Sequence, residues 1–274
     1  MNIENLKQQI NDGLKTFIKE NRKDGNANRA SAASRCVRSN WYRNNKYKEE
    51  ELSPRAILVF AFGDLTEMLA DWLISLAHGP DKYYRKLLFG EGKRGSAVIQ
   101  NGALELVQWT QLEWTTWIDG LAIPGHPDGI GQREDGTWEL IEVKSSATRG
   151  FMRAQMSGVG DYIHQAYTLM ASEEAKQLGI REVNFFYLNK DTQAWDVFPY
   201  VWDETTWEKV QNNFRLANQK EIPDKPYQPE AETFRKKPTG KMKLPWNCGY
   251  CGYNKECWPE AKLEFKSGKP TYYV

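Results

Sequence analysis

The segment Gly125–Ser146, GHPDGIGQREDGTWELIEVKSS, decides the fold class of this chain. It contains two stretches that suit β-strands, separated by a polar turn at residues 134–136, and so predicts a β-hairpin. Because residues two apart on a strand share a face, Glu142 and Lys144 should point to the same side. Asp128 adds a second carboxylate at the start of the hairpin. Carboxylates at close range repel one another unless a cation joins them, and hard divalent cations prefer oxygen ligands.

The loop of this hairpin determines whether Asp128 and Glu142 can share a metal ion. A two-residue loop at residues 135–136 pairs position 128 with 143 and puts Glu142 on the opposite face, because adjacent residues alternate. A three-residue loop at residues 134–136 pairs 128 with 142, and it needs a left-handed residue in its third position, which Gly136 supplies. We therefore predict the three-residue loop or an equivalent bulge.

The composition is that of a globular protein without membrane spans. The 274 residues suffice for one large domain or two small ones, and 40% hydrophobic residues support a core. The net charge is only +1, so the distribution of charge matters more than its sum. No apolar run approaches the thickness of a bilayer, and the N-terminus is polar rather than a signal peptide, which predicts a cytoplasmic protein.

The segment before the hairpin predicts a buried helix and several strands. Ser53–Pro54 has the pattern of an N-cap followed by proline in the first helical position. Residues 54–77 are apolar on most faces, which favours a buried helix. Glu67 lies in its middle, and a buried carboxylate needs a partner such as a metal ion, unless it lies on a solvated edge. Strands are expected over residues 104–107 and 114–123.

The segment after the hairpin predicts a loop and then a helix. Residues 147–160 are rich in glycine and hold two arginines, so we expect a mobile loop over the site. A helix is expected over residues 161–178, carrying Gln165 and Tyr167. An amide on a helix above a metal site can hold a phosphate or the lysine, although Gln165 can also be a residue of the helix surface.

Two further segments are basic. Residues 22–55 hold nine Lys and Arg against four Asp and Glu, with Trp41, Tyr42 and Tyr47 interleaved. Basic and aromatic groups together suit a nucleic-acid backbone and its bases, and a solvated helical face is the alternative. Residues 223–245 form a basic connector punctuated by prolines, which is expected to be extended.

The four cysteines predict a metal site. Cys248, Cys251 and Cys257 form a C-x2-C-x5-C pattern, and Cys36 lies about two hundred residues earlier. In a cytoplasmic protein such cysteines are more often metal ligands than disulfide partners. Thiolate sulfur suits zinc and iron–sulfur clusters alike, so the ligand type alone leaves both open.

These motifs together resemble the PD-(D/E)XK nuclease superfamily. Pro127–Asp128, Glu142 and Lys144 match its central motif. The spacing of Gly63 and Glu67 fits the G-x-x-x-E pattern of the preceding helix. Gln165 is similar to the glutamine that RecB-like members carry on the following helix, where the tyrosine, here Tyr167, usually stands at a different spacing. The order of one distant cysteine and a C-terminal trio resembles the iron–sulfur branch, which includes CRISPR-adaptation nucleases and AddB-type recombination subunits.

The resemblance implies roles for these residues. Ligands of Mg²⁺ or Mn²⁺ would be Glu67, Asp128, Glu142 and the backbone carbonyl of Val143. Lys144 would position the attacking water or stabilise the transition state. A [4Fe–4S] cluster would be held by Cys36, Cys248, Cys251 and Cys257, with structural zinc as the alternative. Candidates for DNA contact or for support of the site, alongside catalytic Gln165, are His126, Arg149, Arg153 and Tyr167.

The resemblance also implies a fold and a function. The expected fold is α/β, with a central mixed β-sheet flanked by helices, in a single nuclease domain over residues 1–274. Its core would span about 53–220, and an iron–sulfur subdomain would join about 22–50 to 244–260. The implied activity is a metal-dependent DNA exonuclease acting on single-stranded or end-accessible DNA in recombination, repair or phage DNA processing, in a bacterium or an infected host cell. A recombination protein is an implied partner. The alternatives are a structure-specific endonuclease and a catalytically silent DNA-binding module with structural zinc.

Overall fold

The chain is α/β, with mixed and antiparallel sheets flanked by helices, as the sequence predicts. The computed structural model describes residues 27–50, 83–85, 94–100, 103–109, 113–234, 237–266 and 269–274, with scattered helical residues between 8 and 16 and between 57 and 73. The chain divides into two compact units, unit 1 with Met1–Ala27, Arg35–Arg55 and Asn213–Val274, and unit 2 with Asn28–Ser34 and Ala56–Asn212. Within the described ranges, no helix is long and apolar enough to cross a membrane.

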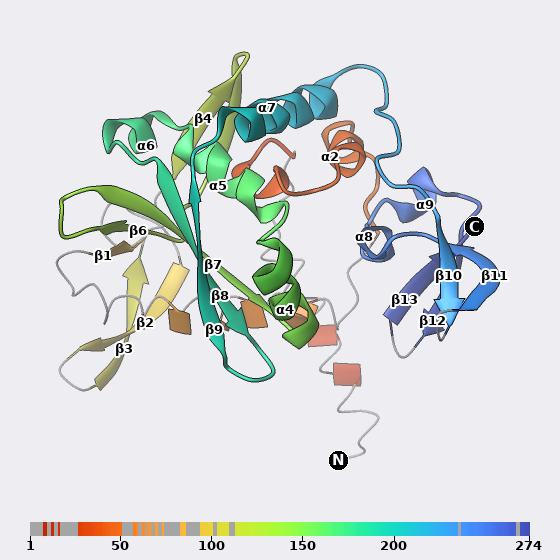
Figure 1. Cartoon of the computed structure of the whole chain (residues 1–274), viewed down its shortest axis with the longest axis horizontal. Helices are drawn as coiled ribbons and strands as arrows, with labels where there is room; N and C mark the ends of the chain where they lie inside the picture. The colour runs from red at the N-terminus through yellow and green to blue at the C-terminus, as the bar shows by residue number, and fades with distance from the viewer. Residues whose placement is uncertain are drawn as a thin grey trace. The chain divides into compact units, whose positions relative to one another are not determined.

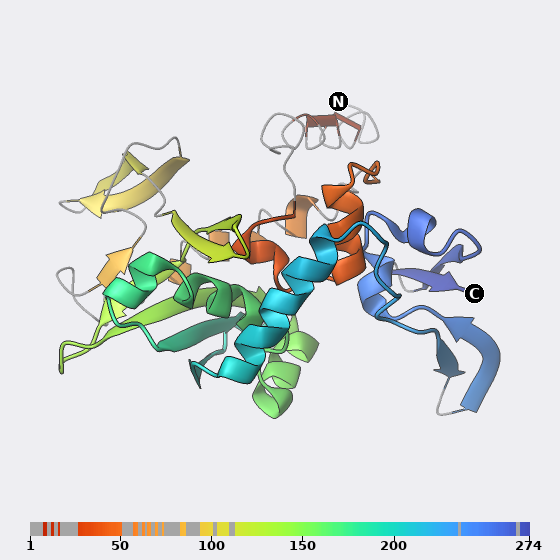
Figure 2. The same ribbon diagram turned by 90° about the horizontal axis from the view of Figure 1, so that it is seen from above.

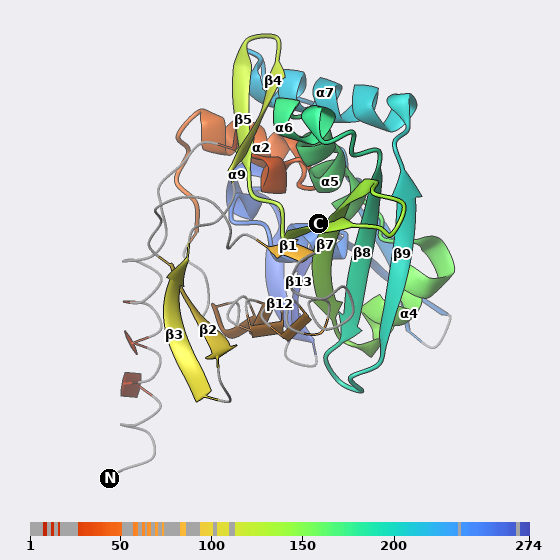
Figure 3. The same cartoon turned by 90° about the vertical axis from the view of Figure 1, so that its left-hand side faces the viewer.

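Unit 2 is built on a five-stranded mixed sheet with the order β1-β6-β7-β8-β9. Its strands are β1 (Tyr83–Arg85), β6 (Gly129–Gln132), β7 (Trp138–Ser146), β8 (Glu182–Asn189) and β9 (Trp195–Val201). Strands β7 and β8 are parallel, and the other neighbouring pairs are antiparallel. Figure 3 shows β7, β8 and β9 side by side.

The burial of each strand follows its place in this sheet. Residues 140–143 of β7 are all buried, which is typical of an interior strand covered on both faces. Strand β9 alternates between exposed and half-buried residues and contains Pro199, which an edge strand tolerates because it need not donate on both sides. Strands β8 and β9 form a second hairpin.

Helices connect the two parallel strands, as a parallel pair requires. They are α4 (Thr148–Ser157), α5 (Tyr162–Met170) and α6 (Glu173–Gln177), and Figure 1 shows α4 and α5 beside the sheet. The 3-10 helix η1 (Ala30–Ala32) packs on α5.

The prediction of a mobile loop over residues 147–160 is wrong, because most of that segment is the helix α4. Phe151 and Ala154 are buried, so packing against the sheet stabilises a helix that glycine disfavours locally. Gly150 permits this packing, since a Cβ there would lie 2.9 Å from both Cβ and Oγ of Ser146.

Unit 2 also contains two other hairpins: β2 (Arg94–Gln100) with β3 (Ala103–Trp109), and β4 (Trp114–Ile118) with β5 (Leu121–Gly125). The strand expected over 104–107 lies within β3. The single strand expected over 114–123 is wrong, because the chain reverses at Asp119 and Gly120, with φ of +50° and +81°. Two positive φ values match the type I′ turn that suits a two-residue hairpin loop.

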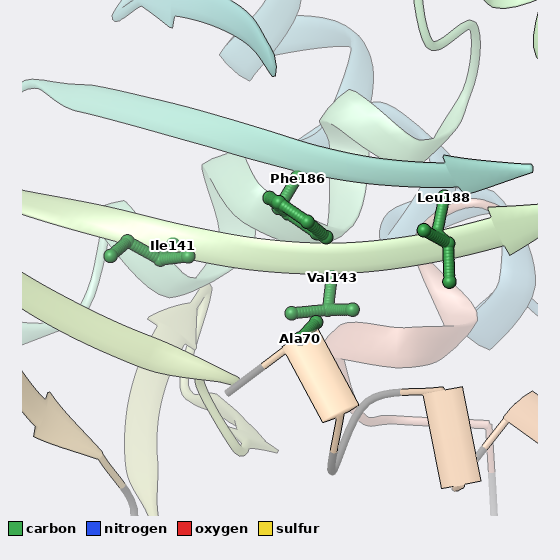
Figure 4. Packing of buried hydrophobic residues seen from close by; sticks show 5 residues of the cluster. All are labelled: Ala70, Ile141, Val143, Phe186 and Leu188. Atoms are coloured by element: carbon green, nitrogen blue, oxygen red, sulfur yellow. The ribbon is translucent and has the colours of Figure 1, made fainter. Parts of the chain in front are cut away.

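The helical residues between 57 and 73 cover one face of the central sheet. Ala70 packs against Ile141 and Val143 of β7 and against Phe186 and Leu188 of β8 (Figure 4). The prediction that this helix is buried on most faces is wrong for the described residues. Exposed apolar side chains lie on the other side of the helix: Leu58, Val59, Phe62, Leu65 and Leu69.

Unit 1 combines segments from distant parts of the sequence. It contains α2 (Val37–Asn44), the end of α7 (Glu204–Asn218), α8 (Trp246–Gly249) and α9 (Asn254–Cys257). Its antiparallel sheet has the order β10-β11-β13-β12, with β10 (Glu230–Phe234), β11 (Lys237–Lys243), β12 (Lys262–Lys266) and β13 (Lys269–Tyr273). These strands are blue in Figure 2. The connector expected over 223–245 therefore includes two strands.

Hydrogen bonds tie α2 to the C-terminal segments. Trp41 Nε1 donates to the carbonyl of Gln219 at 3.0 Å, and the hydroxyl of Tyr42 donates to the carbonyl of Glu256 at 3.2 Å. The rings of Tyr42 and Tyr253 stack with their centres 5.6 Å apart. Unit 1 is thus held by contacts between residues that lie about two hundred positions apart.

Candidate active site and cysteine site

The turn of the β6–β7 hairpin sets the register of the candidate active site. The backbone N–H of Gly136 donates to the carbonyl of Arg133 at 3.0 Å, and the N–H of Arg133 donates to the carbonyl of Thr137 at 2.9 Å. Residues 134–136 therefore form a three-residue loop, and Gly136 has a φ of +86°. The predicted loop is confirmed.

The turn is also stabilised by a side chain. Asp135 Oδ1 accepts hydrogen bonds from the backbone N–H of Thr137 at 2.9 Å and from its hydroxyl at 2.6 Å. These two hydrogen bonds hold the pKa of the exposed Asp135 carboxyl below its ordinary value. An Asp that bonds two residues ahead is a common turn device, so the local sequence specifies this geometry.

The register brings the three motif residues together. Gly129 pairs with Ile141, so the next residues outward, Asp128 and Glu142, lie opposite each other. Lys144 Nζ lies 2.8 Å from Glu142 Oε2 and 3.7 Å from Asp128 Oδ2. The backbone N–H of Val143 donates to Asp128 Oδ2 at 2.8 Å. Asp128 and Glu142 therefore share one cation, the ammonium group of Lys144.

Burial makes this charged group costly unless its charges are balanced. Glu142 is 0% exposed and Asp128 is 8% exposed. A buried carboxylate needs a cation or hydrogen bonds to offset its lost hydration, and Lys144 supplies one positive charge for two negative charges. The oxygen donors suit a hard divalent cation, which would complete the charge balance. The donor set thus fits Mg²⁺ or Mn²⁺.

Two tyrosines, Tyr162 and Tyr187, lie near Lys144, and the sequence did not predict this. The Tyr162 ring of α5 has its centre 5.7 Å from Lys144 Nζ. Tyr187 of β8 lies beside Lys144 in the parallel register. Burial raises the pKa of the Tyr187 hydroxyl, and the charge of Lys144 opposes that rise. The pairing of β7 with β8 was the missing information, because it depends on the crossover rather than on local sequence.

The other predicted site residues lie in different surroundings. Gln165 is half-buried on α5, three residues after Tyr162 and therefore on the same side of that helix. Tyr167 is buried in the core, where its ring stacks on Trp202 at 5.1 Å and its hydroxyl donates to the carbonyl of Val201. Tyr167 thus supports the fold and is not accessible to DNA.

Three candidate residues are exposed. His126 Nε2 lies 3.6 Å from Glu113 Oε2. Arg149 and Arg153 lie on the exposed side of α4, one helical turn apart. Glu67, the third predicted metal carboxylate, lies outside the described residues.

The four cysteines line one cavity in unit 1. Cys251 and Cys257 contact the cluster of Trp41, Tyr42 and Tyr253, and Cys257 also contacts a second cluster that contains Cys248. The fold therefore places Cys36 at the same cavity as the C-terminal trio. No disulfide joins them.

Burial shapes the chemistry of these thiols. It raises the pKa of Cys36 to about 11 and the pKa of Cys248 to about 12, so both thiols are neutral without a metal. The pKa values of Cys251 and Cys257 are also raised by burial, and the charges of Arg38 and Lys225 oppose the rise at Cys257. Sulfur donors around one cavity are by type those of a soft metal or an iron–sulfur cluster, and binding would release protons. Among the described residues, however, no three His, Cys, Asp or Glu side chains are placed so that they could hold one metal ion.

The chain matches no protein-family model and no curated protein. Among solved structures it is similar to one titled "Crystal structure of SSO0001", with 14% identity and a TM-score of 0.45, over 94% of this chain and 98% of that chain.

Proposed function

We propose that this protein is a metal-dependent deoxyribonuclease that hydrolyses phosphodiester bonds in single-stranded or end-accessible DNA. The observation that carries the proposal is the convergence of Asp128, Glu142 and Lys144, with Lys144 Nζ 2.8 Å and 3.7 Å from the two carboxylates. Such a set is what the resemblance to PD-(D/E)XK nucleases requires. Exonuclease action in recombination, repair or phage DNA processing is the form that the resemblance favours.

Each residue of the site has a distinct role in this proposal. Asp128, Glu142 and the carbonyl of Val143 would hold the metal ion, joined by Glu67. A bound divalent ion supplies a bound water of lowered pKa and neutralises charge that builds on the phosphate. Lys144 would orient the attacking water or hold a phosphate oxygen through its ammonium group. Gln165, on the side of α5 that carries Tyr162, would orient the scissile phosphate.

We propose further that the four cysteines hold a [4Fe–4S] cluster with a mainly structural role. A cluster that links Cys36 to Cys248 closes a loop of about two hundred residues, and a cross-link of that span removes about 5 kcal/mol of chain entropy by analogy with a disulfide. Protein purified without oxygen should be brown, with about four irons per chain. Colourless protein with stoichiometric zinc would favour the alternative, and Cys36→Ala should lower cluster content and solubility together.

The nuclease proposal is tested with labelled single-stranded DNA, with and without Mn²⁺. Cleavage should require the metal and should be lost in Asp128→Ala and in Lys144→Ala, while Lys144→Ala should keep most DNA binding. Lys176→Ala is the matched control, because Lys176 is an exposed lysine of α6 paired with Glu173 at 2.8 Å. Near-native cleavage by a folded Lys144→Ala or Asp128→Ala variant would refute the assignment.

A second substrate separates the two enzyme alternatives. An exonuclease needs an end, so closed-circular single-stranded DNA should remain intact while the linear form is degraded. Cleavage of both forms would identify an endonuclease. Metal-independent binding without cleavage of either form would identify a DNA-binding module.

A further inference from the structure

Charge is divided unequally between the two units. Unit 1 holds 23 Lys and Arg against 14 Asp and Glu, a net charge of +9. Unit 2 holds 14 against 22, a net charge of −8, and the two together give the +1 of the whole chain. A polyanion is therefore attracted to unit 1 and repelled by unit 2, although unit 2 contains the carboxylate–lysine site.

Two large aromatic rings of unit 1 are open to solvent. Trp246 is 66% exposed and Tyr250 is 61% exposed. They lie at the start of α8 and at its C-cap, four positions apart, so they project from one side of a helical turn. Among the described residues neither ring stacks on another aromatic side chain. The rings of Trp41, Tyr42 and Tyr253 are buried in a cluster instead.

The backbone beneath these two rings is firmly held. Cys248 between them is buried, and its carbonyl accepts a hydrogen bond from Asn254 Nδ2 at 2.8 Å. Asn247 Nδ2 donates to the hydroxyl of Tyr227 at 2.9 Å. The N–H of Leu244 donates to the carbonyl of Tyr272 at 2.8 Å. The rings are therefore presented on an ordered support, which lowers the entropy cost of binding.

Positive charge precedes this pair of rings in the chain. Strand β11, which ends three residues before Trp246, carries Lys237, Lys241 and Lys243. Lys241 also contacts Glu264 at 2.9 Å, and that exposed pair leaves it accessible to a phosphate. Exposed aromatic rings beside basic residues are the usual means of holding a single strand, because the bases stack and the phosphates pair with cations.

We propose that Trp246 and Tyr250 form a base-stacking platform for a single strand of nucleic acid, and that the positive charge of unit 1 attracts its phosphates. A duplex keeps its bases stacked inside, so only a single strand presents base faces to the rings. The proposal rests on the proposed function for the identity of that strand as the DNA substrate. It assigns binding of the strand to unit 1 and its cleavage to unit 2.

The test measures binding in a buffer free of divalent ions, so that cleavage plays no part. Fluorescence anisotropy of a labelled oligothymidine is titrated with the full chain and its variants. Removing one stacking ring typically costs about 1 to 3 kcal/mol, so Trp246→Ala and Tyr250→Ala should each weaken binding by roughly 5- to 150-fold. Trp246→Phe should retain most of the affinity, because it keeps a ring.

The matched control is Trp117→Ala. Trp117 is 61% exposed on β4 of the acidic unit, so it has the same residue type and exposure without the positive surroundings. Its removal should leave the affinity unchanged. Because all three rings lie mostly in solvent, the variants should keep the thermal midpoint of the parent chain, which circular dichroism checks.

Each outcome decides for or against the platform. Unchanged binding in both Trp246→Ala and Tyr250→Ala, or an equal loss in Trp117→Ala, overturns it. Equal dependence of duplex binding on the rings also overturns it, as does failure of the parent chain to bind any oligonucleotide. Loss of binding in the ring variants without Mn²⁺-dependent cleavage in the parent supports the platform while refuting the nuclease. Unchanged binding in the ring variants, together with Mn²⁺-dependent cleavage by the parent, refutes the platform and supports the nuclease.

Discussion

Lys144 should stabilise the metal-free protein as well as serve the proposed reaction. Its amino group lies 2.8 Å from a carboxylate of Glu142, which is 0% exposed. Lys144→Met keeps the aliphatic stem and removes the charge, so the buried carboxylate loses that counter-charge and repulsion from Asp128 increases. Breaking a buried ion pair from one side typically costs about 3 to 5 kcal/mol. The cost should lie at the lower end of that range, because 14% of the Lys144 side chain is exposed.

A loss of about 3 kcal/mol corresponds to a fall of roughly 6 to 12 °C in the thermal midpoint for a protein of this size. The measurement is the thermal unfolding of metal-free protein at pH 7, followed by circular dichroism. Mn²⁺ should restore much of the loss, because a divalent cation can replace the missing charge between Asp128 and Glu142. The restoration by Mn²⁺ should be larger in Lys144→Met than in the parent chain.

Two variants control the interpretation. Lys176→Met removes an exposed lysine whose pair with Glu173 has both side chains more than half exposed, so its effect should be below about 1 kcal/mol. The double variant Glu142→Gln with Lys144→Met removes both charges and should be more stable than Lys144→Met alone. If Lys144→Met has the same thermal midpoint as Lys176→Met, the electrostatic account of this site is wrong. It is also wrong if the double variant is the least stable of the variants.

Three further predictions concern the hairpin, the core tyrosine and the cysteine cavity. Gly136→Ala should lower the unfolding free energy by about 1 kcal/mol in urea titrations, because an alanine at a positive φ is strained while the space around it is open. Gly136→Asn should lose less. Tyr167→Phe removes the hydroxyl that donates to Val201, so it should lower stability by about 1 kcal/mol and leave DNA cleavage unchanged; loss of cleavage without loss of stability would contradict this. Metal-free protein should be most stable below pH 9, the ordinary thiol pKa, and should lose stability as pH rises toward the raised pKa values of about 11 for Cys36 and about 12 for Cys248. A thermal midpoint that rises over that interval would contradict the burial of these thiols.

The features that the sequence predicted correctly depend on short-range geometry. The register of the β6–β7 hairpin follows from a three-residue loop, from the left-handed Gly136 and from the alternation of side chains along a strand. Those are properties of about twenty consecutive residues, so Asp128, Glu142 and Lys144 could be assigned to one face without knowledge of the fold. The turn at Asp119 and Gly120 is equally local, but the prediction of a single strand over 114–123 overlooked the Asp-Gly pair that favours it.

The features that the sequence did not predict depend on contacts between distant segments. Gly150 of α4 suggests a loop in the sequence, but it is the residue that allows the helix to approach Ser146. The buried Phe151 stabilises the helix only through its packing on the sheet. Likewise, Tyr187 reaches Lys144 because a crossover of three helices returns the chain parallel to β7. Tertiary packing overrides local preference in both cases.

The cysteines and the charges show the same division between sequence and structure. The sequence by itself determined which four thiols could form a site and that basic residues gather around them, because both are matters of composition and spacing. Only the tertiary structure decided that Cys36 shares a cavity with the C-terminal trio, and that the chain's +1 is the sum of a basic unit and an acidic unit. The physical reason is that the burial of Trp41, Tyr42 and Tyr253 in one cluster joins segments about two hundred residues apart, and no local pattern encodes such a pairing.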